Sequence, residues 1–429
     1  MISVLRGILG VTIFLLICVA LSADRKKINR RLVAGGLLLQ FAIAVIVLKV
    51  PWVTTGLEAA SRFFIQILAF STEGAEFAFG TLVSDTTIGA VWAFQVLPSV
   101  IFLSALASVL FYLGLLQKIV YAFAWVMHRT MDLSGAESLA VAANVFIGQS
   151  EAPLVIRPYL ERMTRSEISC LMTGGMATIA GSVLVAYIAI LGGADPVLQV
   201  EVGRRLIAAS IMAAPAAVVF AKILVPETEQ IDRDLNVPRE TIGVNVFDAL
   251  VVGTTQGIRL AVNIGGIVIV FIALAAMLNY MTTHWIGSWS GLNETIATST
   301  DGAFEGLTLQ FVFGVLFAPV AWLTGVDGGS LLFVGQLFGE KLVLNEFVAY
   351  ISMSEMIAAG HLTDPKAIVI STFALCGFAS FVSIGIQIGG IGALAPGQRE
   401  NLAKLGLRAL LGGTCATLVT ATIAGMFFG

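Results

Sequence analysis

Residues 144–158 of this chain have the sequence Asn-Val-Phe-Ile-Gly-Gln-Ser-Glu-Ala-Pro-Leu-Val-Ile-Arg-Pro. An amide, a hydroxyl and a carboxylate follow one another at Gln149, Ser150 and Glu151. Pro153 then removes a backbone donor and breaks the helix. Inside a membrane, polar side chains and broken backbone are tolerated only where they line a protein-enclosed or watery cavity. If this stretch lies at that depth, it marks a binding site.

The composition indicates an integral membrane protein. Of the 429 residues, 58% are hydrophobic and 12% are charged, whereas soluble domains carry about 25% charged residues. The net charge of -3 gives no indication of a nucleic-acid partner. Four cysteines lie in apolar runs without disulfide or metal-ligand spacing, and the three histidines are scattered, so we expect no resident cofactor.

Apolar runs of about twenty residues predict the membrane spans. Residues 1–115 are expected to form scaffold helices, with spans at 3–21, 32–50 and 90–115 and an interfacial segment at 51–91. The first run lacks a signal-peptide cleavage site. The basic loop at 25–31 should be cytoplasmic, which places the N-terminus outside.

Residues 116–224 are expected to form a first transport repeat. An interfacial helix at 116–131 precedes a hairpin at 134–163, a broken helix at 166–191 and a span at 203–224. The hairpin region is too long for one span and has a helix breaker near its middle. Two half-helices that enter and leave on the cytoplasmic side, a re-entrant hairpin, satisfy both conditions.

Residues 225–283 are expected to form a cytoplasmic loop and a long scaffold helix, and 284–429 a second transport repeat. That repeat contains a hairpin at 328–356, a broken helix at 366–394 and a last helix at 402–428. Segment 284–306 lacks Lys and Arg, which favours the outside. Run 307–325 then lies on the outer surface without crossing, and the C-terminus is also outside.

The two halves share a short internal match. Gly175-Met-Ala-Thr178 corresponds to Gly377-Phe-Ala-Ser380, and each tetrapeptide follows a hairpin that carries a glutamate, Glu151 or Glu346. The first hairpin enters from inside and the second from outside, so the repeat is inverted. Inverted repeats with broken helices near the bilayer midplane are typical of transporters.

Each polar feature also has a structural interpretation. The group Gln149–Glu151 could cap the second half-helix. Glu346 could form a structural salt bridge with Lys341, and the small residues from Ala374 to Gly385 could serve helix packing. Together, however, they supply carboxylates, amides, hydroxyls and an aromatic ring with no basic side chain at the tips. This chemistry favours a neutral, polyhydroxylated molecule with a flat heterocycle.

Three motifs resemble the concentrative nucleoside transporter family: Gly148-Gln-Ser-Glu-Ala-Pro-Leu154, Asn345-Glu-Phe-Val-Ala-Tyr350 and Cys376-Gly-Phe-Ala379. The resemblance covers nearly the whole chain. It implies an all-α integral membrane protein of about eight transmembrane helices plus two opposed re-entrant hairpins in an inverted repeat, with interfacial helices. It further implies a homotrimer in the lipid of the bacterial inner membrane, with uptake of nucleosides such as uridine or adenosine coupled to an ion.

The resemblance also implies residue roles. Gln149, Ser150 and Glu151 would face the nucleobase beside Val183, Glu346 and Ser383 would hold the ribose, and Phe378 would pack against the nucleoside. Ser380 stands where the family usually has Asn, which removes reach and one hydrogen-bonding group. Na⁺ would bind the side chains of Asn144 and Thr178 and the carbonyls of Ile147 and Ile179.

Other functions stay open at this point. An H⁺-coupled nucleoside symporter uses the same site with a different ion, and a passive channel would not transport against a gradient. An intramembrane hydrolase could use Glu151 and Glu346, but the motifs contain no nucleophile–base pair or metal-ligand cluster. We therefore expect a Na⁺-coupled secondary active transporter with no catalytic residues.

Overall fold

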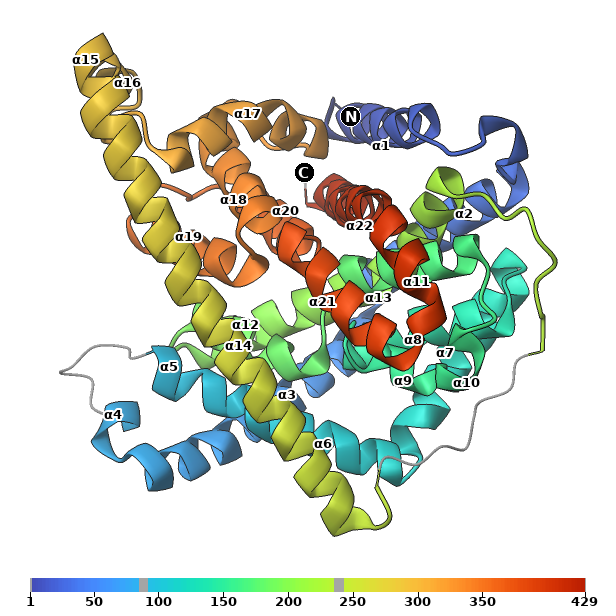
Figure 1. Ribbon diagram of the computed structural model, residues 1–429. Helices are drawn as coiled ribbons and strands as arrows, with labels where there is room; N and C mark the ends of the chain where they lie inside the picture. Colours follow the sequence, from blue (N-terminus) through green and yellow to red (C-terminus); the bar gives the residue numbers. More distant parts are fainter. Residues whose placement is uncertain (1, 85–91, 235–242, 429) are drawn as a thin grey trace.

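The computed structural model describes residues 2–84, 92–234 and 243–428, and every regular element among them is a helix (Figure 1). Asp85, the start of the third predicted span at Ala90 and the end of the predicted cytoplasmic loop at Thr241 lie outside these residues. Seven helices of the described part are long and apolar enough to cross a membrane. The interrupted pair α20 (Pro365–Leu375) and α21 (Phe381–Leu394) corresponds to the remaining predicted span, 366–394.

The N-terminal helices follow the predicted spans closely. Helices α1 (Ile2–Ala20) and α2 (Arg30–Lys49) are joined by the basic loop, where Asn29 caps α2. Helix α3 (Pro51–Phe79) occupies most of the predicted interfacial segment 51–91 and ends before Gly80, which has φ 60°. Short helices α4 (Thr81–Ser84) and α5 (Trp92–Gln95) precede α6 (Leu97–Tyr112).

The first repeat begins with α7 (Leu115–Met131), α8 (Gly135–Ile147), α9 (Ala152–Val155) and α10 (Arg157–Leu160). It continues with α11 (Arg165–Ala177), α12 (Gly181–Gly192) and α13 (Pro196–Leu224). The predicted second half-helix is two short helices, because each begins with a proline, Pro153 or Pro158, at one of its first two positions. The predicted break in 166–191 falls at 178–180.

The second repeat has the same order of elements. Helix α17 (Leu309–Thr324) is followed by α18 (Leu331–Val343), α19 (Glu346–Ala358), α20, α21 and α22 (Arg399–Phe427). Corresponding helices make corresponding contacts: α7 with α8 as α17 with α18, and α11 with α13 as α20 with α22. The element order therefore supports the internal repeat more strongly than the tetrapeptide match does.

There are two helix pairs: α8 pairs with the short helices α9 and α10, and α18 pairs with α19. The two pairs begin at opposite ends of α1. The loop after α1 contacts the end of α13 through Ala23 N–H and Leu224 O at 2.9 Å, and α13 also holds the start of α8. At the other end, Arg6 of α1 forms an ion pair of 2.9 Å with Asp327, just before α18. The described chain ends lie together at this second end (Figure 1). The end of α2 lies there too, since Lys49 Nζ donates to Phe427 O at 3.3 Å.

Helix α14 (Val246–Tyr280) crosses the whole molecule (Figure 1). It continues through the π-helical segment Met281–Gly287 into α15 (Ser288–Ser290), and α16 (Leu292–Ser299) follows. The predicted boundary between 283 and 284 therefore falls within a continuous helix. Helix α14 packs on α6, where Gly253 and Gly257 lie so close to the α6 backbone that a Cβ would come within 2.7 Å of it.

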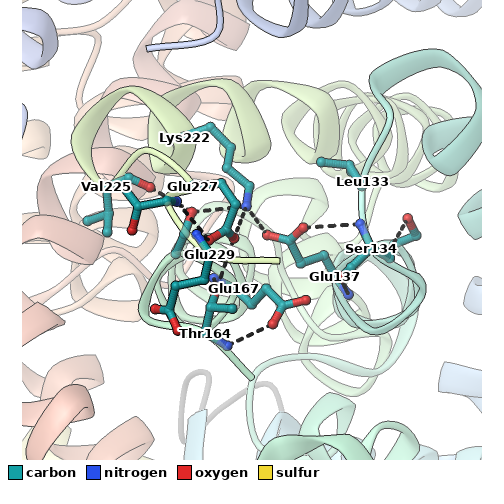
Figure 2. Close-up of polar contacts among 12 residues, drawn as sticks. Leu133, Ser134, Glu137, Thr164, Glu167, Lys222, Val225, Glu227 and Glu229 are labelled. Carbon is teal, nitrogen blue, oxygen red and sulfur yellow. Dashed lines mark hydrogen bonds and ion pairs between the residues drawn. The ribbon is translucent and has the colours of Figure 1, made fainter. Parts of the chain in front are cut away.

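A buried ionic cluster fixes the starts of α8 and α11 (Figure 2). Ser134 with Glu137 and Thr164 with Glu167 form capping boxes that begin α8 and α11. Lys222 of α13 forms an ion pair with the fully buried Glu137 and donates to Ser166 Oγ at 2.9 Å. One lysine thereby ties α8 and α11 to α13.

Lys222→Met should destabilise the fold strongly, because it leaves the Glu137 carboxylate buried without a cation, at a cost of about 3–5 kcal/mol. Lys404→Met is the matched control, because its partner Glu400 is 78% exposed and such pairs contribute less than about 1 kcal/mol. The measurement is unfolding of the purified protein in detergent. The double change Glu137→Gln with Lys222→Met should recover much of the loss, and equal losses from the two lysine changes would contradict this account.

Candidate functional site

One cavity of about 180 Å³ lies where two connections between helices meet. These connections are the first tip, residues 148–151 between α8 and α9, and the second tip, residues 344–345 between α18 and α19. All eight side chains predicted to bind the substrate line it: Gln149, Ser150, Glu151, Val183, Glu346, Phe378, Ser380 and Ser383. Helix α14 closes one side with Leu260, Asn263, Ile264 and Ile267. No Lys, Arg or His is found among the described residues that line it. Their roles in binding remain predictions.

Two glycines allow the tip and the helix breaks to meet. Gly148 has φ 82°, and a Cβ there would clash with Ala180 in the break between α11 and α12. Gly377 has φ 153° in the break between α20 and α21, and a Cβ there would lie 2.8 Å from Ala177 O. The first tip and both breaks therefore lie against one another, which brings polar backbone groups to the cavity.

A chain of hydrogen bonds orients the first tip. Gln387 Nε2 of α21 donates to Gln149 Oε1 at 2.9 Å and to Met172 O at 3.0 Å. Gln149 Nε2 in turn donates to Ser383 Oγ at 3.2 Å, and Ser383 Oγ lies 3.3 Å from Ser380 Oγ. Gln149, which is predicted to face the nucleobase, is therefore hydrogen-bonded to Ser383, which is predicted to hold the ribose.

The second tip presents Glu346 at the first position of α19. Asn345 caps this helix by accepting from Val348 N–H at 3.0 Å. Tyr187 O–H of α12 donates to Glu346 Oε1 at 2.9 Å, and both side chains are buried. No ion pair joins Lys341 to Glu346 among the described residues, so the proposed structural salt bridge is not formed.

Glu151 has no cap hydrogen bond to α9, although it occupies the N-cap position. Its side chain lines the main cavity and also an adjoining, mostly apolar cavity of about 130 Å³ between α3, α6 and α12. Glu151 therefore does not cap α9 through a side-chain hydrogen bond, and its role in binding stays a prediction. A larger cavity of about 720 Å³ beside α3 is lined by none of the predicted residues.

The four residues predicted to hold an ion lie at the end of α8 and in the break between α11 and α12. Asn144 and Thr178 are fully buried, and Thr178 Oγ1 donates to Asn144 O and to Gly174 O at 2.9 Å each. Asn144 Oδ1 is buried without a hydrogen-bond partner. Ile147 ends α8 and Ile179 lies in the helix break, where carbonyls lack intrahelical partners. This set of neutral oxygens fits a small hard cation.

Three residues of the site were not found from the sequence: Gln387, Tyr187 and Asn263. Each is a single polar side chain within an apolar helix, a pattern with no specific signal. Gln387 follows Ser383 by four residues on α21, so helical spacing from Ser383 could have identified it.

Comparisons with known proteins agree along the chain. Family models described as "Na+ dependent nucleoside transporter" match residues 9–82 for the N-terminus and 205–425 for the C-terminus, and one described as "Nucleoside recognition" matches 93–194. An uncharacterized transporter of Haemophilus influenzae is 41% identical over 100% of this chain and 98% of its own length. The putative nucleoside permease NupX of Escherichia coli is 35% identical over 100% and 99%.

Sodium/nucleoside cotransporter 2 of Rattus norvegicus is 36% identical over 98% of this chain and 62% of its own length. The structure of CNTnw in an inward-facing, substrate-bound state covers all of both chains with 39% identity and a TM-score of 0.89. A CNTnw variant in an outward-facing state covers 100% and 98%, with 38% identity and a TM-score of 0.87.

Members of this family are nucleoside transporters and not enzymes, which excludes the hydrolase alternative. Identity of this level over the full length, together with the motifs at both tips, leaves one assignment. This multi-pass membrane protein belongs to the concentrative nucleoside transporter family.

Proposed function

We propose that this protein imports nucleosides by coupling their uptake to an inward Na⁺ gradient. The observation that carries the proposal is the cavity between the tips. It combines two carboxylates, amides, hydroxyls and Phe378 without any basic side chain in its described lining. Such a site suits a neutral ligand with many hydroxyls and a flat ring, and it disfavours a phosphorylated one.

The proposed binding mode divides the cavity between the two tips. Gln149, Ser150 and Glu151 contact the nucleobase beside Val183, while Glu346 and Ser383 hold the ribose hydroxyls. Phe378 packs against the nucleoside, and Ser380 borders the sugar with a shorter side chain than the usual Asn. The bond between Gln149 and Ser383 must then open or be shared when the ligand enters.

The proposed Na⁺ site uses the side chains of Asn144 and Thr178 and the carbonyls of Ile147 and Ile179. Support comes from the unpartnered Asn144 Oδ1 and from the position of the site at the root of the first tip. An ion there neutralises the carbonyl ends of α8 and α11 and favours the tip geometry that the nucleoside requires. Proton coupling is the alternative, with Glu346 as the carrier, because no ion pair joins this buried carboxylate to a cation within the part of the chain that the structure describes.

We further propose alternating access by a moving unit, 116–224 with 284–429, on a scaffold of 1–115 and 225–283. The two helix pairs are re-entrant in the bacterial inner membrane, with both termini outside. Large apolar side chains of α14 are exposed in the single chain, for example Val262 at 67% and Ile269 at 71%. Lipid or neighbouring subunits of a homotrimer would cover them.

Uridine or adenosine should accumulate in proteoliposomes when an inward Na⁺ gradient is imposed. Choline in place of Na⁺ is the control, and radiolabelled uptake is the measurement. Absence of accumulation for every nucleoside would refute nucleoside import. Equal accumulation with a proton gradient and no Na⁺ would refute only the coupling ion.

Glu346→Gln should reduce uridine uptake roughly tenfold or more, because hydrogen bonds to a charged group contribute about 1.5–3 kcal/mol. Glu355→Gln is the matched control, since Glu355 is an exposed carboxylate on the same helix α19. Uptake is corrected for the amount of folded protein. Wild-type uptake by Glu346→Gln would remove Glu346 from the site.

Thr178→Val should raise the Na⁺ concentration for half-maximal uptake several-fold, because it removes one oxygen ligand at nearly constant volume. Thr173→Val is the control on the same helix, since Thr173 is also fully buried but lies outside the proposed ligand set. The Na⁺ dependence of initial uptake rates measures both. Identical shifts in the two variants would attribute the effect to packing.

A further inference from the structure

The cavity between the tips has an apolar neighbour. This second space, the apolar cavity, has a volume of about 130 Å³ and lies between α3, α6 and α12. Glu151 lines both cavities. At the start of α12, Ala180 and Val183 line the cavity between the tips. Gly181 and Ser182, which lie between them in the sequence, line the apolar cavity. The two spaces are therefore adjacent at Glu151 and at the first turn of α12.

Aromatic and aliphatic side chains form most of the wall of the apolar cavity. The larger ones come from α3, α6, α8 and α9, for example Phe63, Phe64, Leu103, Phe111, Phe146 and Leu154. In another protein, an engineered cavity of about 150 Å³ lined by Leu, Ile and Phe stays dry and binds benzene. The apolar cavity therefore has the size and the polarity that suit one phenyl ring.

Two polar side chains lie at the boundary between the cavities. Ser182 is 7% exposed, and its Oγ has no hydrogen-bond partner among the described residues. The Glu151 side chain makes no cap hydrogen bond to α9 and forms no ion pair within the described part of the chain. Buried polar groups normally have partners. A ligand that crosses this boundary would meet an acceptor at Glu151 and a hydroxyl group at Ser182.

The boundary suits one kind of substituted nucleobase. In the proposed binding mode the base faces Gln149, Ser150 and Glu151, and the apolar cavity adjoins the last of these. The exocyclic amine of adenine or cytosine carries two N–H groups. Replacement of one hydrogen by an apolar group leaves the second N–H to donate to the Glu151 carboxylate. The same amine then places the apolar group in the apolar cavity.

We propose that the apolar cavity extends the nucleoside site and binds an aryl or alkyl group on the exocyclic amine of the base. This inference rests on the proposed binding mode and on the proposed alternating access. The cavity lies between α3 and α6 of the proposed scaffold and α8, α9 and α12 of the proposed moving unit. A substituent in this cavity contacts both parts. Such a nucleoside therefore binds tightly, holds the two parts together and inhibits uptake without being transported.

The first measurement uses the wild-type protein in proteoliposomes with radiolabelled uridine. N6-benzyladenosine and N4-benzylcytidine are compared with adenosine and cytidine as inhibitors of uridine uptake. For each parent that competes with uridine, the benzyl derivative should inhibit about tenfold more strongly, because its ring leaves water for an apolar space. Radiolabelled benzyl derivative should not accumulate.

Equal or weaker inhibition by the benzyl derivatives, or their accumulation at the rate of the parent, would overturn the proposal. So would a failure of both parents to compete, because Glu151 would then not contact an exocyclic amine. Absence of Na⁺-driven uptake of any nucleoside would instead refute nucleoside import itself, so the two failures are distinguishable.

The second measurement fills the apolar cavity and follows competition with a labelled nucleoside on the purified protein, so that it does not depend on transport. Ala107 of α6 lines the cavity, and Ala107→Leu occupies part of it. This variant should bind the parent nucleoside normally and lose the advantage of the benzyl derivative. Ala122→Leu makes the same change at an exposed position of α7 and should keep the advantage.

A folded Ala107→Leu that keeps the full benzyl advantage would overturn the proposal. If Ala107→Leu does not fold, the wild-type protein decides with derivatives that carry both a methyl and a benzyl group on the amine. These compounds have no N–H for Glu151 and should lose most of the advantage. Full retention of the advantage by them would overturn the proposed contact at the boundary.

Discussion

Interrupted helices inside an apolar protein leave backbone polar groups that must find partners without water. This protein meets the constraint by placing its interruptions against one another. Gly148 packs on Ala180, and Gly377 packs on the carbonyl of Ala177, so the first tip and both breaks converge. In the proposed function, the backbone at the breaks and the side chains at the tips bind the ion and the nucleoside. The cavity is therefore a consequence of how the breaks are satisfied.

The charges near the point where the helix breaks converge differ between the two repeats. The first repeat presents the neutral oxygens of Asn144 and Thr178, while the second presents the ammonium group of Lys341 to Ala374 O. At the start of α8, away from the tip, Lys222 and Glu137 hold α8 and α11 to α13. An ion at Asn144 and a nucleoside at Gln149 would act on the same short tip, which is the physical basis for coupling.

The tip residues could be predicted because polar side chains and breakers stand out in an apolar chain. Glu151, Glu346 and Ser383 were assigned to one site from their motifs, and the structure brings them to one cavity. Contacts between distant residues could not be predicted in this way. Lys222 with Glu137 joins residues far apart in the sequence, and the partner of Lys341 is a backbone carbonyl that composition does not reveal.

The central claim is that the ion site and the nucleoside cavity are energetically linked through the first tip. The most direct measurement is calorimetric binding of uridine to the purified protein in Na⁺ and in choline. The account predicts tighter uridine binding in Na⁺, and an equal factor by which uridine tightens Na⁺ binding, because such linkage is reciprocal. Uridine affinity that is the same in Na⁺ and choline would contradict it.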